Sequence, residues 1–429
     1  MNALIKIIGS NKKRLVDLTI YFLGIFVLKG ASFILTPIYT RVFSTEQYGI
    51  IELANSILSF FGMLIGFGLC QYLGIEYFHY KDKDRTLAIE KNIILYITIA
   101  LPIVAMLLVI NSAGLLHFRS LDRSIVNLIL IASFFVYFSN LCLMLCKNQN
   151  KTTIMTIIQL VTGLITLFMN YMGVCYWGWG IYSILIATVI SNIILTVLVP
   201  VVYKLNVKIS IIDINAEYAY RILRVSIPLA ITGLVNSILL LSDRWILNYF
   251  CSIGDIGIYS LATKFGGIFE LILINTLTIF YSPHIYKSYQ ELGIKESEKK
   301  NRRNLLLYLG ICIIGIFFFV IAVKLLFPIL IGDKFLESEK YLWLILIGDT
   351  FLGAMYFRTY LINYNKKTTS ILIINVIAMV FNLVANIILI PKYKVWAAAL
   401  TTTCSYLLMF LIATVINQKE YQSKLECDD

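Results

Sequence analysis

The chain has 429 residues, of which 59% are hydrophobic and only 14% are charged, whereas soluble domains are roughly 45–50% apolar and about 25% charged. No water-soluble fold of this length can bury so much apolar surface, so the composition indicates a polytopic membrane protein. The net charge of +12 does not favour nucleic-acid binding, because Lys and Arg accumulate in the cytoplasmic loops of membrane proteins.

The chain begins with a basic segment, residues 1–17, that contains Lys6, Lys12, Lys13 and Arg14. The apolar stretch that follows is too long for a signal-peptide core, and no small-residue cleavage site comes after it. We therefore expect an uncleaved first transmembrane span.

Twelve segments reach the length of about 20 apolar residues that a transmembrane helix needs. They are residues 18–39, 50–73, 92–115, 124–145, 154–175, 180–203, 225–249, 258–282, 305–327, 341–364, 371–390 and 395–416. The termini and even-numbered loops contain 24 Lys and Arg residues, against 7 in the other loops. The positive-inside rule therefore predicts that both termini are cytoplasmic.

The spans divide the chain into two halves. We expect a first six-helix lobe at residues 1–203, a cytoplasmic amphipathic linker at 204–224, a second lobe at 225–417 and a cytoplasmic tail at 418–429. The linker mixes Ile211, Ile212 and Tyr218 with charged residues, as a helix lying on the membrane surface would. Neither this loop nor the loop at 283–304 could hold a catalytic domain.

Two short internal repeats link the halves. The pattern G-I-x-x-L-A begins at Gly49 and again at Gly257, an offset of 208 residues, and K-T-T begins at Lys151 and again at Lys367, an offset of 216. Both matches pair spans that are six apart. Because six is even, the halves share one orientation, which predicts an all-α fold of two six-helix bundles related by a pseudo-two-fold axis along the membrane normal.

Polar residues recur at matching places in spans 5 and 11. At the second offset, Gln159, Thr166 and Asn170 align with Asn375, Asn382 and Asn386. Residues at i, i+7 and i+11 lie on one stripe of an α-helix. We expect these stripes to face the interior of the protein.

Several basic residues fall within spans. A Lys at the centre of a transmembrane helix costs about 2.5–3.5 kcal/mol and should face an interior or a water-filled cavity. Lys29, Arg244 and Lys264 each lie on or beside a polar stripe. The stripe residues include Ser32 and Thr36 in span 1, Asn236 and Asp243 in span 7, and Ser260 and Asn275 in span 8.

We interpret Lys29, Arg244, Lys264 and Arg358 as a cationic set that binds an anionic ligand. Ion pairs that hold helices together, such as Asp243 with Lys264, are the structural alternative. Lys324 can reach the interface, Arg358 could anchor a cytoplasmic end, and carboxylates such as Glu52 and Glu270 could neutralise part of the set. We do not expect the carboxylate-dominated cavity that an exporter of cationic drugs would need.

The sequence contains no recognisable enzyme signature. His79, His117 and His284 are isolated, so we predict neither a metal site nor a catalytic triad. No Walker motif is present, and the eight cysteines form no CxxC pair. We expect a transporter without a cofactor.

Several motifs resemble one transporter family. Pro37-Ile38-Tyr39-Thr40-Arg41 followed by Glu46-Gln47-Tyr48-Gly49 resembles the end of the first span in O-antigen (Wzx-type) polysaccharide flippases of the MATE-like multidrug/oligosaccharidyl-lipid/polysaccharide (MOP) exporter superfamily. Further matches are Ser226-Ile227-Pro228, Ser242-Asp243-Arg244, 257–264, Tyr281-Ser282-Pro283, 365–368 and 390–399. One departure is that Lys394 and Trp396 replace glycines often found after the turn at residues 391–393.

The resemblance implies a flippase that moves an undecaprenyl-diphosphate-linked oligosaccharide, a unit of O-antigen, capsule or exopolysaccharide, to the outer leaflet of the bacterial inner membrane. Membrane lipids, a coupling ion (H⁺ or Na⁺) and the polysaccharide polymerase machinery are further partners that it suggests, and nucleic acid is not among them. Lys and Arg would bind the diphosphate, while Tyr and Asn would bind sugars.

Two alternatives from other classes stay open. A lipid-linked polysaccharide polymerase or membrane glycosyltransferase usually needs a large outer loop, which this chain lacks. A cation-coupled drug exporter of the same superfamily would have the same fold.

Overall fold

The computed structural model describes residue 33 and residues 35–76, 82–116, 118–148, 152–202 and 216–428. Most of the predicted first span, including Lys29 and Ser32, lies outside the described residues, as do residues 203–215 of the predicted linker. Every regular element in the described ranges is a helix, which confirms the predicted all-α class.

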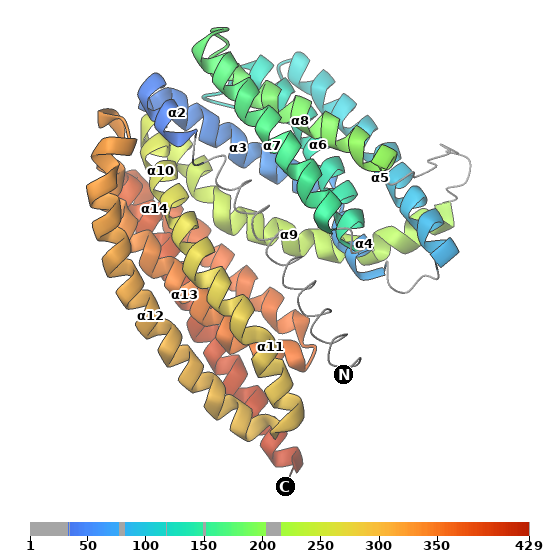
Figure 1. Cartoon of the computed structure of the whole chain (residues 1–429), viewed down its shortest axis with the longest axis vertical. Coiled ribbons are helices and arrows are strands. Elements are labelled where there is room, and N and C mark those ends of the chain that lie inside the picture. Colours follow the sequence, from blue (N-terminus) through green and yellow to red (C-terminus); the bar gives the residue numbers. More distant parts are fainter. Residues whose placement is uncertain are drawn as a thin grey trace, which may run out of the picture. The chain divides into compact units, whose positions relative to one another are not determined.

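Where the connections are described, short segments join successive helices (Figure 1). The first part of the chain forms α2 (Thr36–Val42), α3 (Thr45–Ile65), α4 (Leu69–Glu76), α5 (Asp82–Ser112), α6 (Arg123–Asn148), α7 (Thr152–Cys175) and α8 (Tyr182–Val202). The second part forms α9 (Ala216–Phe250), α10 (Ile253–Phe269), the π-helical segment η3 (Glu270–Asn275), α11 (Thr276–Glu291), α12 (Gly293–Leu330), the 3₁₀ segment η4 (Asp333–Ser338), α13 (Glu339–Tyr364) and α14 (Thr368–Asp428).

These helices agree with the predicted spans. Nine helical stretches of the described chain are long and apolar enough to cross a membrane. The last of them, α14, contains two predicted spans, 371–390 and 395–416, on either side of a kink. Because α9 begins at Ala216, residues 216–224 of the predicted linker form the first turns of this helix.

The kink in α14 lies at Lys394, whose φ of 51° and ψ of −128° are non-helical. A positive φ is normally adopted by glycine, because a Cβ atom then clashes with the neighbouring backbone. Lys394 therefore stands where the family resemblance led us to expect glycine, and its backbone carries strain of about 1–3 kcal/mol.

The chain folds into two compact units. The first comprises Met1–Val42 and Ala54–Leu234, and the second comprises Phe43–Leu53 and Val235–Asp429. The start of α3 thus packs with the second half of the chain, while the rest of α3 belongs to the first unit. Helix α9 likewise contributes to both units.

The first unit contains a broken helix. Between α3 and α4, Phe67 and Gly68 both have positive φ values, 49° and 69°. A Cβ on Gly68 would lie 2.2 Å from the carbonyl oxygen of Ser226 on α9. Only glycine allows the chain to turn this close to α9.

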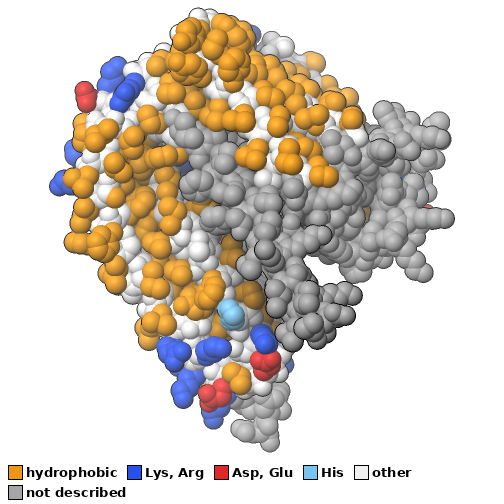
Figure 2. Space-filling view, viewed as in Figure 1, with side chains coloured by type: hydrophobic (Ala, Val, Ile, Leu, Met, Phe, Trp, Pro, Cys, Tyr) orange, Lys and Arg blue, Asp and Glu red, His pale blue; other side chains and the backbone are white. Residues whose placement is uncertain are grey.

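The second unit packs around α13 and α14. Leu239, Met355, Ile374, Ala378 and Tyr406 form one of its apolar clusters. Helix α12 is much more exposed, with Leu306, Ile313 and Phe317 each more than 60% accessible. Figure 2 shows apolar side chains over much of the described part of one face, with Lys and Arg at its margins. This distribution fits a surface in contact with lipid.

Candidate functional site

The second unit encloses a cavity of about 330 Å³. Its walls come from the start of α3 and from α9, α10, η3, α13 and α14. The charged residues that line it are Glu52, Asp243, Arg244, Lys264, Glu270 and Asp349. Six Asp, Glu, Lys or Arg side chains in one cavity among membrane-spanning helices mark it as the candidate site, because such residues are rare there without a function.

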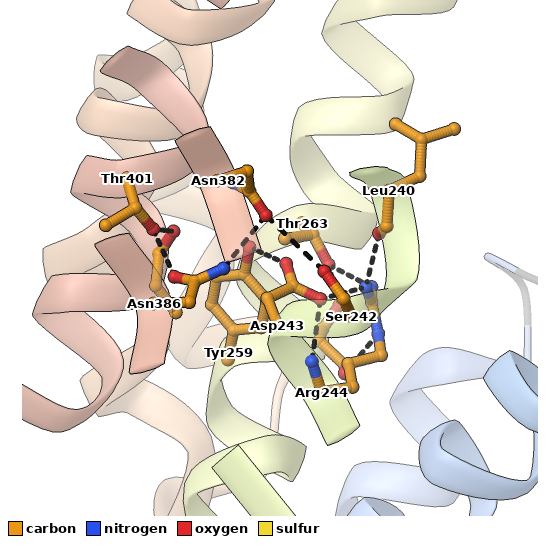
Figure 3. Close-up of polar contacts among 11 residues, drawn as sticks. Leu240, Ser242, Asp243, Arg244, Tyr259, Thr263, Asn382, Asn386 and Thr401 are labelled. Carbon is orange, nitrogen blue, oxygen red and sulfur yellow. Dashed lines mark hydrogen bonds and ion pairs between the residues drawn. The ribbon is translucent and has the colours of Figure 1, made fainter. Parts of the chain in front are cut away.

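Asp243 and Arg244 form a close pair on α9 (Figure 3). Asp243 is only 2% exposed. Its Oδ1 accepts from Arg244 Nη1 at 3.2 Å, and its Oδ2 accepts a hydrogen bond from the Tyr259 hydroxyl of α10. The buried carboxylate is therefore both charge-paired and hydrogen-bonded, as burial of a charge requires.

Most donors of Arg244 are already engaged. Its Nε donates to Ser260 Oγ at 3.2 Å, its Nη2 to Thr263 Oγ1 at 2.9 Å, and its Nη1 to the Leu240 carbonyl at 3.2 Å as well as to Asp243. A guanidinium has five N–H groups, so one is left without a partner in the described chain. Arg244 thus ties α9 to α10 and forms a fixed part of the cavity wall.

Lys264 on α10 is held more loosely. Its Nζ lies 3.7 Å from Glu52 Oε1, which is beyond hydrogen-bonding distance, and 3.2 Å from the Tyr48 hydroxyl. The side chain is 22% exposed. An ammonium has three N–H donors, so Lys264 keeps donor capacity for a ligand in the cavity.

Glu270 and Asp349 add two carboxylates that have no cationic partner within the described chain. Glu270 begins the π-helical segment η3, and its Oε1 accepts from Asn275 Nδ2 at 3.4 Å. On an α-helix, the side chains of residues five apart point about 140° away from one another. A π-helix has i→i+5 hydrogen bonds, which bring residues five apart closer to the same face. The π turn therefore lets Asn275 reach back to Glu270.

A buried network of neutral side chains adjoins Asp243 (Figure 3). Asn382 Oδ1 accepts from Ser242 Oγ at 3.4 Å and from Asn386 Nδ2 at 2.9 Å, and Asn386 Oδ1 accepts from the Thr401 hydroxyl. The polar stripe of span 11 thus binds both segments of α14 to α9.

The structure brings only some of the predicted site residues together in one cavity. Arg244, Lys264 and Asp243 line the same cavity, and Arg358 is not among its lining residues. Gln159 lines a different cavity in the first unit. Among the other predicted residues, Thr36, Asn170, Asn375 and Asn382 are buried and Asn236 is partly buried, while Lys29 and Ser32 lie outside the described residues.

Two features of this site differ from the expectations. Lys264 does not pair with Asp243, the example considered from sequence, but with Glu52, which the sequence had offered as one of the carboxylates that could neutralise part of the set. The cavity is lined by four carboxylates and only two cations, although we expected no carboxylate-rich cavity, because acidic residues from four separate helices converge there. Tyr48 and Tyr259, which bind Lys264 and Asp243, were missed as site residues although both lie in the motifs of the family resemblance.

Comparison with solved structures identifies the fold. A multidrug-resistance MATE family transporter of the MOP superfamily in an inward-facing conformation aligns over 95% of this chain and 98% of its own, with a TM-score of 0.72 and 12% identity. The lipid II flippase MurJ in an inward closed conformation aligns over 94% and 89%, with a TM-score of 0.68 and 15% identity. A MOP superfamily transporter from Pyrococcus furiosus aligns over 96% of both chains, with a TM-score of 0.62 and 11% identity. The chain therefore has a MATE-like fold, and its long apolar helical stretches make it a multi-pass membrane protein.

The family is given by the sequence match. The model of a family described as polysaccharide biosynthesis protein matches residues 15–286, more than half of the chain. The chain belongs to this polysaccharide biosynthesis family. No curated protein sequence matches it.

Proposed function

We propose that this transporter flips an undecaprenyl-diphosphate-linked oligosaccharide to the outer leaflet of a bacterial inner membrane by alternating access. The observation that carries the proposal is the membership of the polysaccharide biosynthesis family. A MATE-like fold and a polar cavity within an apolar helical unit support a transport role rather than catalysis.

Lys264 is the described residue best suited to hold the diphosphate. Its pair with Glu52 is long, and its ammonium keeps N–H donors that a phosphate oxygen can accept from. Arg244 has one remaining N–H and acts mainly by holding the wall. Lys29 of the first span stays in the proposed cationic set, whereas Arg358, which does not line the cavity, is left out of it.

Replacing Lys264 with Ala is expected to reduce surface polysaccharide about tenfold or more per molecule of transporter. One charge-assisted hydrogen bond contributes about 1.5–3 kcal/mol, and each 1.4 kcal/mol is a factor of ten. Lys264→Arg should keep most of the activity. The measurement is complementation of a deletion strain, normalised to the amount of protein in the membrane. Full export by a Lys29→Ala, Lys264→Ala double variant at normal abundance would refute the cationic role.

The orientation follows from the positive-inside rule, with both termini proposed to be cytoplasmic. Single cysteines at Lys299 and Ser423 in a cysteine-free chain should be labelled only from the cytoplasm, and those at Lys334 and Lys392 from the outside. All four side chains are exposed, so burial does not prevent labelling. External labelling at Lys299 would contradict the twelve-span topology.

A cation-coupled exporter is the second candidate function, and the carboxylate content of the cavity favours it. Glu270 and Asp349 are not paired with a cation among the described residues, so they could bind H⁺ or Na⁺, or a cationic substrate. The two functions separate in a strain lacking this chain: loss of surface polysaccharide supports the flippase, whereas unchanged polysaccharide with increased sensitivity to cationic drugs supports the exporter.

A further inference from the structure

The first unit contains a second cavity, of about 450 Å³. Its walls come from α3, α4, α6 and α7. None of its lining residues is charged, whereas the cavity of the second unit is lined by six charged residues. Its volume falls within the range of about 300–1,000 Å³ that is usual for small-molecule sites.

Three amide side chains face this cavity with hydrogen-bonding capacity to spare. Oε1 of Gln71 is buried without a hydrogen-bond partner, and its Nε2 contacts only the Met63 sulfur at 3.8 Å. The side-chain amides of Asn140 and Gln159 make no hydrogen bond within the described residues. A buried amide oxygen without a partner costs about 1–3 kcal/mol, which a ligand hydroxyl in the cavity would offset.

The break between α3 and α4 positions the Gln71 side chain at the cavity wall. The chain turns at Phe67 and Gly68, and Gln71 lies in the first turn of α4. The Tyr137 hydroxyl of α6 accepts from the backbone N–H of Cys70 at 2.9 Å and so fixes this turn against the cavity wall. Interrupted transmembrane helices commonly form the binding sites of transporters.

The internal repeat relates the two cavities. At the offset of 208 residues, Ser59 and Gly62 of the first cavity correspond to Gly267 and Glu270 of the second. The π-helical segment Glu270–Asn275 corresponds to residues 62–67, where the helix of the first unit begins to break. Both units therefore interrupt the same helix beside a cavity, but the first has glycine where the second has a carboxylate.

We infer that the first-unit cavity binds uncharged sugar residues of the transported molecule. This inference rests on the proposed flippase function. It adds the place at which the carbohydrate part of the substrate binds. Sugar hydroxyls both donate and accept hydrogen bonds, as amides do, and Met63, Met144 and Tyr137 offer apolar surface to the C–H faces of a sugar ring. A diphosphate would find no cation in this cavity, and a lipid chain would leave the amides unpaired.

The test measures binding of two probes to the full-length protein in nanodiscs. One probe is the lipid-linked oligosaccharide extracted from a strain in which the gene of this chain is deleted, and the other is undecaprenyl diphosphate, which has no sugar. Gln71→Leu combined with Gln159→Leu should weaken binding of the oligosaccharide probe about 5- to 150-fold, as expected for two neutral hydrogen bonds. Binding of undecaprenyl diphosphate should change less than about twofold.

Two matched variants complete the design. Gln290→Leu makes the same chemical change at an exposed residue that lines neither cavity and should bind both probes as wild type does. Lys264→Gln should weaken both probes. An unchanged affinity of the Gln71→Leu, Gln159→Leu variant for the oligosaccharide, or an equal loss for both probes, would overturn the sugar site and leave the flippase proposal standing. Failure of the wild-type protein to bind either probe would overturn the flippase proposal and this inference with it.

Discussion

Arg244→Gln is expected to lower the amount of this protein in the membrane severely. Asp243 is 2% exposed and has its charge neutralised by Arg244, so the substitution leaves a buried, uncompensated carboxylate. Removing one partner of a buried ion pair commonly costs about 3–5 kcal/mol, which is a large part of the 5–15 kcal/mol by which folded proteins are typically stable. The hydrogen bonds to Ser260 and Thr263 that join α9 to α10 are weakened at the same time.

The double variant Asp243→Asn, Arg244→Gln tests whether Arg244 matters by neutralising Asp243 or by binding the substrate. Because it removes both charges, its abundance in the membrane should recover most of the way towards wild type, and export per molecule should recover with it. Quantitative immunoblotting of membranes, together with surface polysaccharide per molecule, measures both effects. If Arg244→Gln is present at normal abundance and yet exports poorly, Arg244 binds the substrate and is not needed to stabilise the cavity wall.

The second large effect is expected at the contact between α3 and α10. A Cβ on Gly49 would lie 1.9 Å from the Ile253 carbonyl oxygen, and one on Gly257 would lie 2.3 Å from the Thr45 carbonyl oxygen. The two helices therefore touch through their backbones, as glycine allows in membrane proteins. Gly257→Leu should force the two helices apart. Overpacking typically lowers the free energy of unfolding by about 1–3 kcal/mol, and we expect at least that loss here.

This substitution should also weaken the site, because Tyr48 and Glu52 on α3 contact Lys264 on α10. We expect a lower thermal unfolding temperature in detergent and a loss of export larger than the loss of protein. Gly310→Leu is the matched control, since no atom beyond the adjacent backbone of its own helix lies within 4 Å of the Cβ that it would add. An unfolding temperature for Gly257→Leu equal to that of Gly310→Leu would show that the close contact is not required.

The same glycines show what a repeat in the sequence can and cannot reveal. The matching G-I-x-x-L-A segments predicted that Gly49 and Gly257 hold equivalent places in two halves. They did not reveal that these two residues also touch one another, because contact between segments about 200 residues apart depends on how the helices pack. Residues 43–53 belong to the second unit for the same reason, because they pack against helices that are distant in the sequence.

The sequence by itself determined the class of the protein. An apolar content of 59% and apolar runs of about 20 residues are properties of each segment alone, and the bilayer requires such segments to be helical. For that reason the described helices agree with the predicted spans to within a few residues at many of their ends. The motifs that resemble polysaccharide flippases were also local, and they led to the family that the match confirms.

The tertiary structure decided which charges meet. Lys264 pairs with Glu52 rather than Asp243, Arg244 is bound by residues of α10, and carboxylates from four helices converge on one cavity. Each outcome depends on the distance and rotation between helices, which periodicity along one helix does not contain. The break at Phe67 and the π turn at Glu270 likewise lie each beside one of the two cavities. Both depend on contacts with other helices, which the sequence of a single helix does not contain.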